Sequence, residues 1–215
     1  MTVARGADPM GPALLVDDHP LFRLGFVAAW RLARPREPIV EASDLASARR
    51  LLNAHTRLLI VDLLLPDGFG LDLAAAAVAG AVPYVVLSTA DAPAIVEAAR
   101  RGGARAFFSK EMDPHGILRQ IDRILGDPTE RCFPESPPLP ALTPREQDVL
   151  GGLLAGLGNR EIAEALGLGT ETVKSHAAML FVRLGASDRF EAVRIARDLG
   201  YDLALTYLQG GRPGA

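Results

Sequence analysis

Five short apolar runs recur along the first half of the chain, and each is continuous rather than alternating with polar residues. The runs are ALLVD (13–17), PIVEA (38–42), LLIVD (58–62), PYVVLS (83–88) and ARAFFS (104–109). Continuous runs of this kind are typical of strands that are covered on both faces. The segments between them have helical length and are rich in alanine and leucine, at 21–32, 45–53, 71–79, 94–101 and 117–125. The alternation predicts a five-stranded parallel sheet with helices on both faces, spanning residues 12–126.

The pattern changes after residue 126. Residues 127–140 contain five prolines and no hydrophobic periodicity, which predicts an extended, semi-rigid linker. Residues 141–204 contain no strand-like run, and a capping-box pattern from Thr143 to Glu146, with proline between them, marks the start of a helix. Four short helices with glycine-bearing connections are predicted here, in an all-α helix-turn-helix arrangement. A C-terminal tail is predicted over 205–215.

Composition narrows the class of protein. Hydrophobic residues make up 49% of the chain and the formal net charge is -3, which is ordinary for a globular protein. No apolar stretch approaches the roughly 20 residues that cross a bilayer, and the N-terminus lacks the apolar core of a signal peptide. The single cysteine, Cys132, cannot form an internal disulfide. These features predict a cytoplasmic protein with no membrane contact. Lysine is scarce, with only Lys110 and Lys174 in the chain.

Polar residues stand where the predicted strands end. Asp17 and Asp18 follow the first strand, Asp62 ends the third, Ser88 ends the fourth and Lys110 follows the fifth. In an open parallel sheet these carboxyl ends meet at one edge, where ligands bind. Three clustered carboxylates repel one another unless a cation intervenes, and an all-oxygen site suits Mg²⁺. Asp62 is then placed to act as a nucleophile in phosphoryl transfer, with Lys110 and Ser88 contacting the phosphoryl oxygens.

The ordered segments VDDHP, VDLLLPDG, VLSTAD and AFFSKE resemble the receiver domain of bacterial two-component response regulators. The resemblance implies a flavodoxin-like fold with Asp62 as the phosphoacceptor. It implies a Mg²⁺ site made by Asp17, Asp18, Asp62 and the backbone carbonyl of Leu64. It also implies that Ser88 moves toward the phosphoryl group, that the ring of Phe107 turns inward behind it, and that the surface of the domain changes as a result.

Each of these residues also has a simpler explanation when it is taken alone. The acidic pair at 17 and 18 could cap the helix that follows, Ser88 could be a loop hydroxyl, and Phe107 could be a core ring. His19 has no second nitrogen or sulfur ligand nearby in the sequence, which favours a structural or solvent-facing role over a metal-binding one. The coincidence of all five site residues at the ends of four of the five strands favours the phosphoryl site.

Two apolar positions predict the lifetime of the phosphorylated form. Leu64 lies two residues after Asp62, and Ala90 lies two residues after Ser88. Neither side chain can orient or activate a water molecule that attacks the aspartyl phosphate. We therefore predict slow loss of the phosphate.

The segments LTPREQDVL, GLGNREIAEAL, TETVKSHAAMLFVRLG and SDRFEAVRIA resemble the LuxR-type helix-turn-helix of the NarL/FixJ group of response regulators. Such a module puts its third helix in the major groove, with the N-terminal part of the helix at the base edges. By this resemblance Lys174 and Ser175 face bases or nearby phosphates, Ala178 follows one turn later, and Thr172 is a candidate phosphate contact.

The charge of this region is unusual for a DNA-binding module. Residues 141–215 contain eight Arg or Lys and nine Asp or Glu, a formal balance of -1. Phosphate neutralisation supplies most non-specific affinity, so a single copy is expected to bind DNA weakly and to lose binding quickly as salt rises. Two copies on a two-fold-symmetric site would offset this weakness. We therefore expect a homodimer, with the last predicted helix, 188–199, as the self-contact within the module.

These observations predict a DNA-binding transcription regulator that is not an enzyme and that a sensor histidine kinase phosphorylates on Asp62. Its expected partners are the kinase, promoter DNA and a second copy of the chain. One alternative is a signalling adaptor whose helical domain binds protein instead of DNA. Another keeps the same fold but is controlled without phosphorylation. A phosphatase of the aspartyl-phosphate type would use acidic residues spaced one apart on its first strand. It fits poorly, because here Asp17 and Asp18 are adjacent and the nucleophile lies on the third strand.

Overall fold

The computed structural model describes residues 11–208, which form two compact units. Residues 11–91 and 96–135 form the first unit, which contains the sheet. Residues 136–208, together with 92–95, form the second unit, which contains the helical module. The predicted change of architecture after the apolar runs is therefore present. Within the described residues, no helix is both long enough and apolar enough to span a membrane.

The first unit is built on a five-stranded sheet in which all neighbouring strands are parallel. The strands are β1 (Ala13–Val16), β2 (Ile39–Ala42), β3 (Leu58–Asp62), β6 (Tyr84–Ser88) and β7 (Ala106–Ser109). Their order across the sheet is β2-β1-β3-β6-β7. Each strand coincides with one predicted apolar run, so the predicted parallel sheet is confirmed. The order also brings the ends of β1, β3, β6 and β7 side by side.

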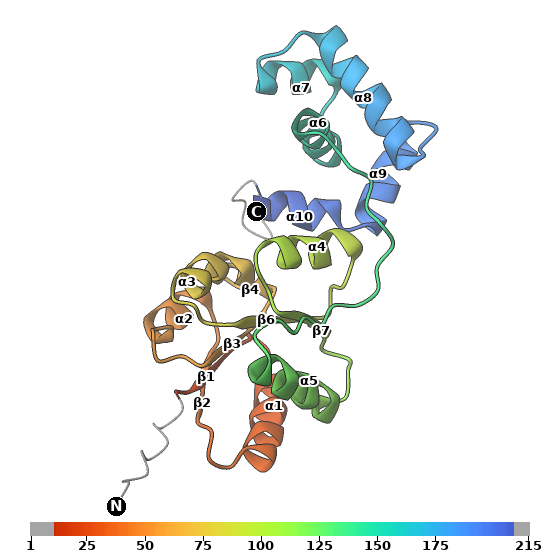
Figure 1. The fold of residues 1–215 in the computed structure, drawn as a ribbon. Helices are drawn as coiled ribbons and strands as arrows, with labels where there is room; N and C mark the ends of the chain where they lie inside the picture. Colours follow the sequence, from red (N-terminus) through yellow and green to blue (C-terminus); the bar gives the residue numbers. More distant parts are fainter. Residues whose placement is uncertain (1–10, 209–215) are drawn as a thin grey trace, which may run out of the picture. The chain divides into compact units, whose positions relative to one another are not determined.

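Helices cover both faces of this sheet (Figure 1). One face carries α1 (Pro20–Ala33) and α5 (Pro114–Gly126), and the other carries α2 (Leu45–Leu51), α3 (Ala74–Ala79) and α4 (Pro93–Arg101). A short hairpin of β4 (Leu64–Leu65) and β5 (Gly68–Phe69), followed by the 3-10 helix η1 (Gly70–Leu73), connects β3 to α3. Pro20 and Pro114 each occupy the first turn of a helix, where a missing N–H costs nothing.

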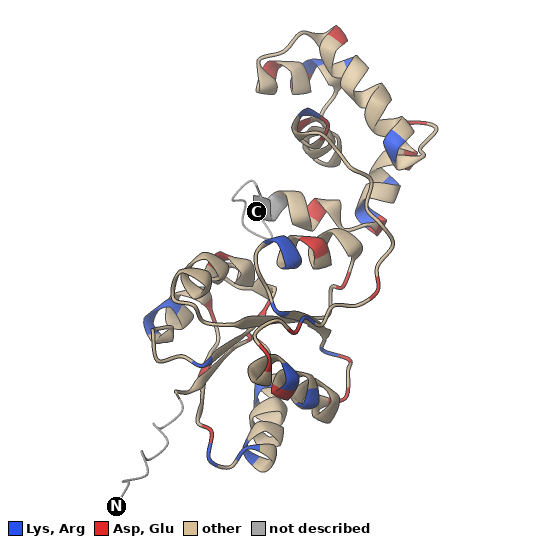
Figure 2. Cartoon of the chain, in the orientation of Figure 1, with Lys and Arg blue, Asp and Glu red and all other residues tan. Residues whose placement is uncertain are grey.

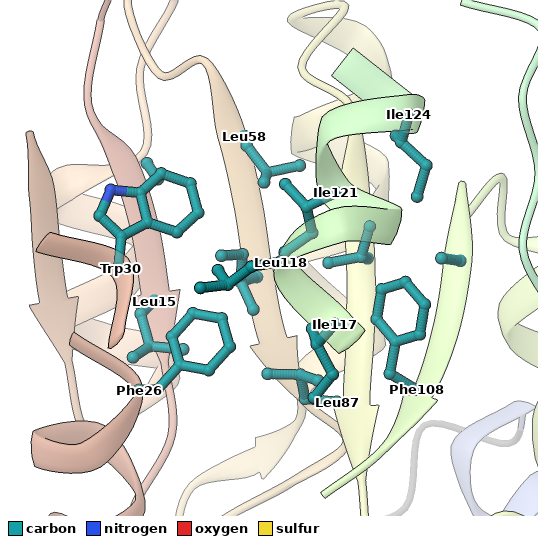
Figure 3. Packing of buried hydrophobic residues seen from close by; sticks show 14 of the residues in the cluster. Leu15, Phe26, Trp30, Leu58, Leu87, Phe108, Ile117, Leu118, Ile121 and Ile124 are labelled. Carbon is teal, nitrogen blue, oxygen red and sulfur yellow. The ribbon is translucent and has the colours of Figure 1, made fainter. Parts of the chain in front are cut away.

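Large apolar side chains from α1 and α5 pack on one face of the sheet (Figure 3). Burying one such side chain stabilises the fold by roughly 1.5–3 kcal/mol. The labelled members of this core are Leu15, Phe26, Trp30, Leu58, Leu87, Phe108, Ile117, Leu118, Ile121 and Ile124. The rigid core beneath the sheet fixes the strand ends, which is the condition for holding several site residues at defined distances.

The first part of the predicted linker lies against the edge of β7. The Cys132 N–H donates to the Arg105 carbonyl at 3.0 Å, and the Phe107 N–H donates to the Cys132 carbonyl at 2.9 Å. The Arg105 guanidinium donates to the Glu130 carbonyl at 3.1 Å, and Arg100 stacks over the ring of Phe133 at 4.3 Å. Nothing in the composition of this segment indicates such pairing. The prolines that follow it, from Pro134 onward, lie outside this strand-like contact.

The second unit contains the four predicted helices and one more. They are α6 (Pro144–Leu154), α7 (Asn159–Leu166), α8 (Thr170–Leu184), α9 (Arg189–Asp198) and α10 (Tyr201–Leu208). The additional helix α10 crosses the predicted start of the tail at residue 205, because Tyr201, Ala204 and Leu205 are buried. Residues 209–215, the rest of the predicted tail, lie outside the described residues.

Local signals explain where these helices begin and end. The Thr143 hydroxyl accepts from the Glu146 N–H at 3.3 Å, and the Glu146 carboxylate accepts from the Thr143 N–H at 2.7 Å, so the predicted capping box is present. Gly167 and Gly185 end α7 and α8 in the left-handed conformation that favours glycine, with φ of 65° and 70°. Gly167 thus begins the short connection between α7 and α8, as in a helix-turn-helix.

Candidate functional site

The ends of neighbouring strands bring three predicted site residues into contact. Asp17 follows β1, Asp62 ends β3, and Lys110 follows β7. The Lys110 ammonium lies 2.7 Å from Asp17 Oδ2 and 2.5 Å from Asp62 Oδ2. The Lys110 backbone N–H also donates to the Ser88 carbonyl at 3.0 Å, which fixes the start of the loop that carries the lysine. The Lys110 ammonium thus contacts two carboxylates that lie 93 and 48 positions before it in the sequence.

Both carboxylates of this ion pair are buried. Asp17 is fully buried and Asp62 is 4% exposed, and the Lys110 side chain is 7% exposed. Burial raises the pKa of Asp62 above its usual value, Lys110 opposes that rise, and the charge of Asp17 adds to it. One ammonium cannot neutralise two buried carboxylates. The pocket therefore retains negative charge that a further cation would offset.

The remaining oxygen atoms fit a divalent cation. Asp18 lies at the open side of the pocket, and Asp17, Asp18, His19 and Asp62 offer ligand atoms that all lie within 4.8 Å of one another. Asp17 Oδ2 and Asp18 Oδ1 are buried and accept no hydrogen bond, so the contact of Asp17 with Lys110 is one of charge alone. Carboxylate oxygens with room for water are the ligands that Mg²⁺ prefers. The Leu64 N–H donates to Asp62 Oδ1 at 3.4 Å, so Leu64 lies next to the acidic group, and the role of its carbonyl as a metal ligand stays a prediction.

His19 lies next to the acidic group. Its Nδ1 atom lies 2.7 Å from Asp18 Oδ1 and 3.4 Å from Asp17 Oδ1, although its side chain is 67% exposed. This exposure fits the predicted solvent-facing role, and the contacts with Asp17 and Asp18 are an addition that the sequence did not indicate. The alternative in which the acidic pair caps α1 is also wrong, because Asp17 accepts from the His19 N–H and α1 has no side-chain cap.

The two predicted switch residues are buried next to the pocket. Ser88, at the end of β6, is 1% exposed, and its hydroxyl accepts from the Ala90 N–H at 3.1 Å. Phe107, in β7, is 3% exposed, and its backbone N–H is the one that pairs with the Cys132 carbonyl. Both residues therefore lie on strands that are continuous with the loops of the site. Their movement on phosphorylation stays a prediction.

The second predicted site lies on the solvent face of α8. Val173, Ala177, Leu180 and Leu184 face the core of the unit. The four predicted DNA-contacting residues, Thr172, Lys174, Ser175 and Ala178, are exposed. This division of the helix follows the period of 3.6 residues, so the buried residues fix which face of α8 remains available.

The basic side chains of α8 are paired with groups of the module itself. The Lys174 ammonium lies 2.7 Å from Glu171 Oε1, and the Ser175 hydroxyl donates to the Glu171 carbonyl at 3.0 Å. The other basic residue of α8, Arg183, donates to Glu146 Oε1 at 2.9 Å and to the Ala141 carbonyl at 3.0 Å. Acidic and basic residues are interspersed along the helices of this unit (Figure 2). The module therefore lacks a continuous basic stripe among its described residues.

The fold and the first site define a receiver domain with a phosphoryl-accepting pocket, followed by a helix-turn-helix module. Two family models agree with this division: "Response regulator receiver domain" matches residues 13–122, and "Bacterial regulatory proteins, luxR family" matches residues 140–196. The chain therefore belongs to the response regulators that join a receiver domain to a LuxR-type DNA-binding domain.

Several curated proteins are similar over most of their length. The probable transcriptional regulatory protein NarL of Mycobacterium tuberculosis is 34% identical over 195 residues, which cover 82% of this chain and 89% of that protein. The transcriptional regulatory protein UhpA of Escherichia coli is 32% identical over 189 residues, covering 84% and 94%. A solved structure of two RcsB dimers bound to two parallel DNAs covers 88% of this chain and 98% of its own, with a TM-score of 0.64 and 21% identity, a likeness that shows the fold.

Proposed function

We propose that this response regulator is phosphorylated on Asp62 by a sensor histidine kinase and that phosphorylation controls promoter binding by the helical module. The observation that carries the proposal is the buried Asp62 carboxylate, 2.5 Å from Lys110, at the end of β3. We assign residues 12–126 to the receiver, 127–140 to the linker and 141–204 to the DNA-binding domain. A regulator of promoters acts where the chromosome is, which places it in the cytoplasm.

In the phosphoryl-transfer step, an Asp62 oxygen attacks the phosphorus of the donor, and the bond from phosphorus to the kinase histidine nitrogen breaks. The product is an aspartyl phosphate on this chain and a free histidine on the kinase. Lys110 neutralises one phosphoryl oxygen from its position beside Asp62. Asp17, Asp18, Asp62 and the Leu64 carbonyl would hold Mg²⁺, which when bound neutralises charge that develops on the phosphoryl group.

The added phosphoryl group supplies a charge of nearly two units and three acceptor oxygens. The Ser88 hydroxyl, which here accepts from the Ala90 N–H, can instead donate to one of these oxygens. Phe107 lies one strand away in β7 and takes up the space that this movement changes. The result is a shifted surface around α4 and β7 that favours the DNA-binding state.

The pocket supports a long-lived phosphorylated form. Leu64 and Ala90 lie two residues after Asp62 and Ser88, and we assign them to the path of an attacking water, which neither side chain could orient with a polar group. We expect the aspartyl phosphate to persist well beyond seconds, as measured by the loss of radiolabel from the isolated protein. A half-life of seconds would contradict this assignment.

In the helical module, Lys174 and Ser175 are assigned to bases or nearby phosphates, with Ala178 one turn further along the same face. Thr172 and the exposed N–H groups at the start of α8 are assigned to a phosphate. Homodimerisation through α9 would place two copies of α8 on one DNA site. The DNA-bound form of the protein is then a dimer on a two-fold-symmetric promoter element.

The adaptor function remains the second candidate, because the formal charge of 141–215 is -1 and Glu171 already pairs with Lys174. Both functions are tested by the affinity of the full chain for DNA from upstream of its own gene, with and without Mg²⁺ and acetyl phosphate. Asp62→Asn is the test variant, and Glu41→Gln, which neutralises a carboxylate on β2, is the matched control.

The proposal predicts tighter binding on phosphorylation in the wild type and in Glu41→Gln, and no tightening in Asp62→Asn. Equal binding in every condition would keep the DNA-binding function and reject phosphorylation as its control. No binding by any form in low salt would favour the adaptor.

A further inference from the structure

Glu171 lies on the same exposed face of α8 as the residues assigned to DNA. Residues at i, i+3, i+4 and i+7 share one side of a helix, and Glu171, Lys174, Ser175 and Ala178 have this spacing. The Glu171 side chain is 85% exposed. If α8 presents Lys174 to the major groove, it presents Glu171 there too, one turn closer to the start of the helix.

A carboxylate at this position weakens binding to the DNA backbone. Residues 141–215 contain nine acidic residues against eight basic ones, and Glu171 lies 2.7 Å from Lys174, the one lysine of the module. Both effects reduce phosphate neutralisation, on which non-specific affinity depends. A carboxylate in the first turn stabilises the helix through the helix dipole, but that effect is the same for every DNA sequence. A benefit that depends on the DNA sequence has to come from a base.

The Glu171–Lys174 pair matches the major-groove edge of one kind of base pair. In a C·G pair, the cytosine N4 amino group is a donor and the adjacent guanine O6 is an acceptor. Glu171 offers an acceptor and Lys174 offers a donor on neighbouring turns of α8. Adenine also offers an amino group, but its N7 acceptor stands beside that group and repels a carboxylate.

We propose that Glu171 and Lys174 read one C·G base pair together, with Glu171 accepting from cytosine N4 and Lys174 donating to guanine O6. The inference rests on the proposed function, because it requires α8 to lie in the major groove. It adds a specificity-determining residue and a base preference to that function. The ion pair between Glu171 and Lys174 separates when α8 binds DNA. Glu171 then accepts a hydrogen bond from one base, and Lys174 donates one to the other.

The test uses the full chain with Mg²⁺ and acetyl phosphate at fixed salt. A site is selected from randomised duplexes with the wild type, and each position of that site is then replaced by all four base pairs. Binding is measured for the wild type, Glu171→Ala, Glu171→Gln and a control, Glu164→Gln. Glu164 is an exposed carboxylate of α7 paired with Arg160, so its loss changes the net charge of the module by the same amount.

The expected result is a preference for C·G at one position of each half-site, on the order of tenfold in the wild type and the control. Glu171→Ala loses that preference while its affinity for the other sequences rises. Glu171→Gln shifts the preference toward adenine, because an amide can both accept and donate and so can pair with N6 and N7 together.

A uniform rise in affinity for all base pairs in both Glu171 variants would overturn the inference, because it would make Glu171 only a repulsive charge. An unchanged preference at every position would overturn it as well. If the folded wild type binds no duplex, the proposed function fails, and this assignment fails with it.

Discussion

The two lysines of this chain form ion pairs of similar length in opposite surroundings. Lys110 lies 2.5 Å from Asp62 and is 7% exposed, whereas Lys174 lies 2.7 Å from Glu171 and is 53% exposed. Removing one partner of a buried pair leaves an uncompensated charge and is strongly destabilising. An exposed pair exchanges its partner for water at little cost. The two lysines therefore differ in role because of burial and not because of distance. Lys110 stabilises the receiver, whereas Lys174 can exchange Glu171 for a ligand at little cost.

The largest effect is expected from Lys110→Met, because it leaves Asp17 and Asp62 buried together without a cation. The free energy of unfolding of the receiver should fall by about 3–5 kcal/mol. Mg²⁺ should restore part of the loss, since it replaces the missing positive charge. Urea unfolding followed by the fluorescence of Trp30 measures this in the receiver alone, because Trp30 is the single tryptophan and lies in that core.

Lys174→Met is the matched control and should change the receiver transition by nothing measurable. A loss below about 1 kcal/mol in Lys110→Met would contradict the prediction. It would mean that one of the two carboxylates is already protonated in the folded protein, the direction in which burial shifts the pKa of Asp62.

Glu146 extends the comparison to the helical module, because it is an acidic group 3% exposed that pairs with Arg183. Burial opposes ionisation, but the hydrogen bonds from Thr143 and Arg183 outweigh it and lower the pKa of Glu146 below its usual value. A carboxylate with a lowered pKa in the folded state contributes stability above its ordinary pKa. That contribution is lost as the pH falls through the lower value.

Glu146→Gln should therefore lower the stability of the module by about 2 kcal/mol at neutral pH. It should also flatten the loss of stability on the acid side. Thermal unfolding followed by far-ultraviolet circular dichroism measures the effect, and Trp30 fluorescence identifies the separate transition of the receiver. Glu164→Gln, which removes an exposed carboxylate of α7, is the control. The same acid dependence in both variants would contradict the assignment.

A smaller effect is expected where the linker meets β7. Cys132→Pro removes the N–H that donates to the Arg105 carbonyl, whereas Cys132→Ala keeps it. The proline variant should lose about 1 kcal/mol of local stability. The Phe107 amide, which is bonded to the Cys132 carbonyl, should then exchange its hydrogen faster in Cys132→Pro than in Cys132→Ala. Equal exchange in the two variants would show that the pairing does not protect this strand.

The parts of this molecule that the sequence predicts are those with a strong local pattern. The five strands are buried on both faces, so each is a continuous apolar run, and the pocket follows because parallel strands end at one edge. The exposed face of α8 follows in the same way from the spacing of Val173, Ala177, Leu180 and Leu184.

The parts that the sequence does not predict depend on contacts between distant segments. The pairing of Cys132 with β7 uses backbone groups only, and any residue except proline offers these. The placement of His19 against Asp18 depends on the direction in which the chain leaves β1. Helix α10 is short, and it packs against α6 and α9, which precede it in the sequence.

The smallest effect on stability is expected at Lys174, and it sharpens the comparison of the two lysines most directly. Lys174→Ala removes an exposed ion pair, so stability should change by less than about 1 kcal/mol. DNA binding should nevertheless weaken, because the variant loses the basic group nearest to the start of α8.

If Lys174 contacts a phosphate, the slope of affinity against salt falls by roughly one. If it donates to a guanine instead, discrimination at one base pair falls while the slope changes little. Binding measured over a salt series on matched and mismatched duplexes distinguishes these outcomes, and unchanged affinity in both would remove Lys174 from the DNA interface.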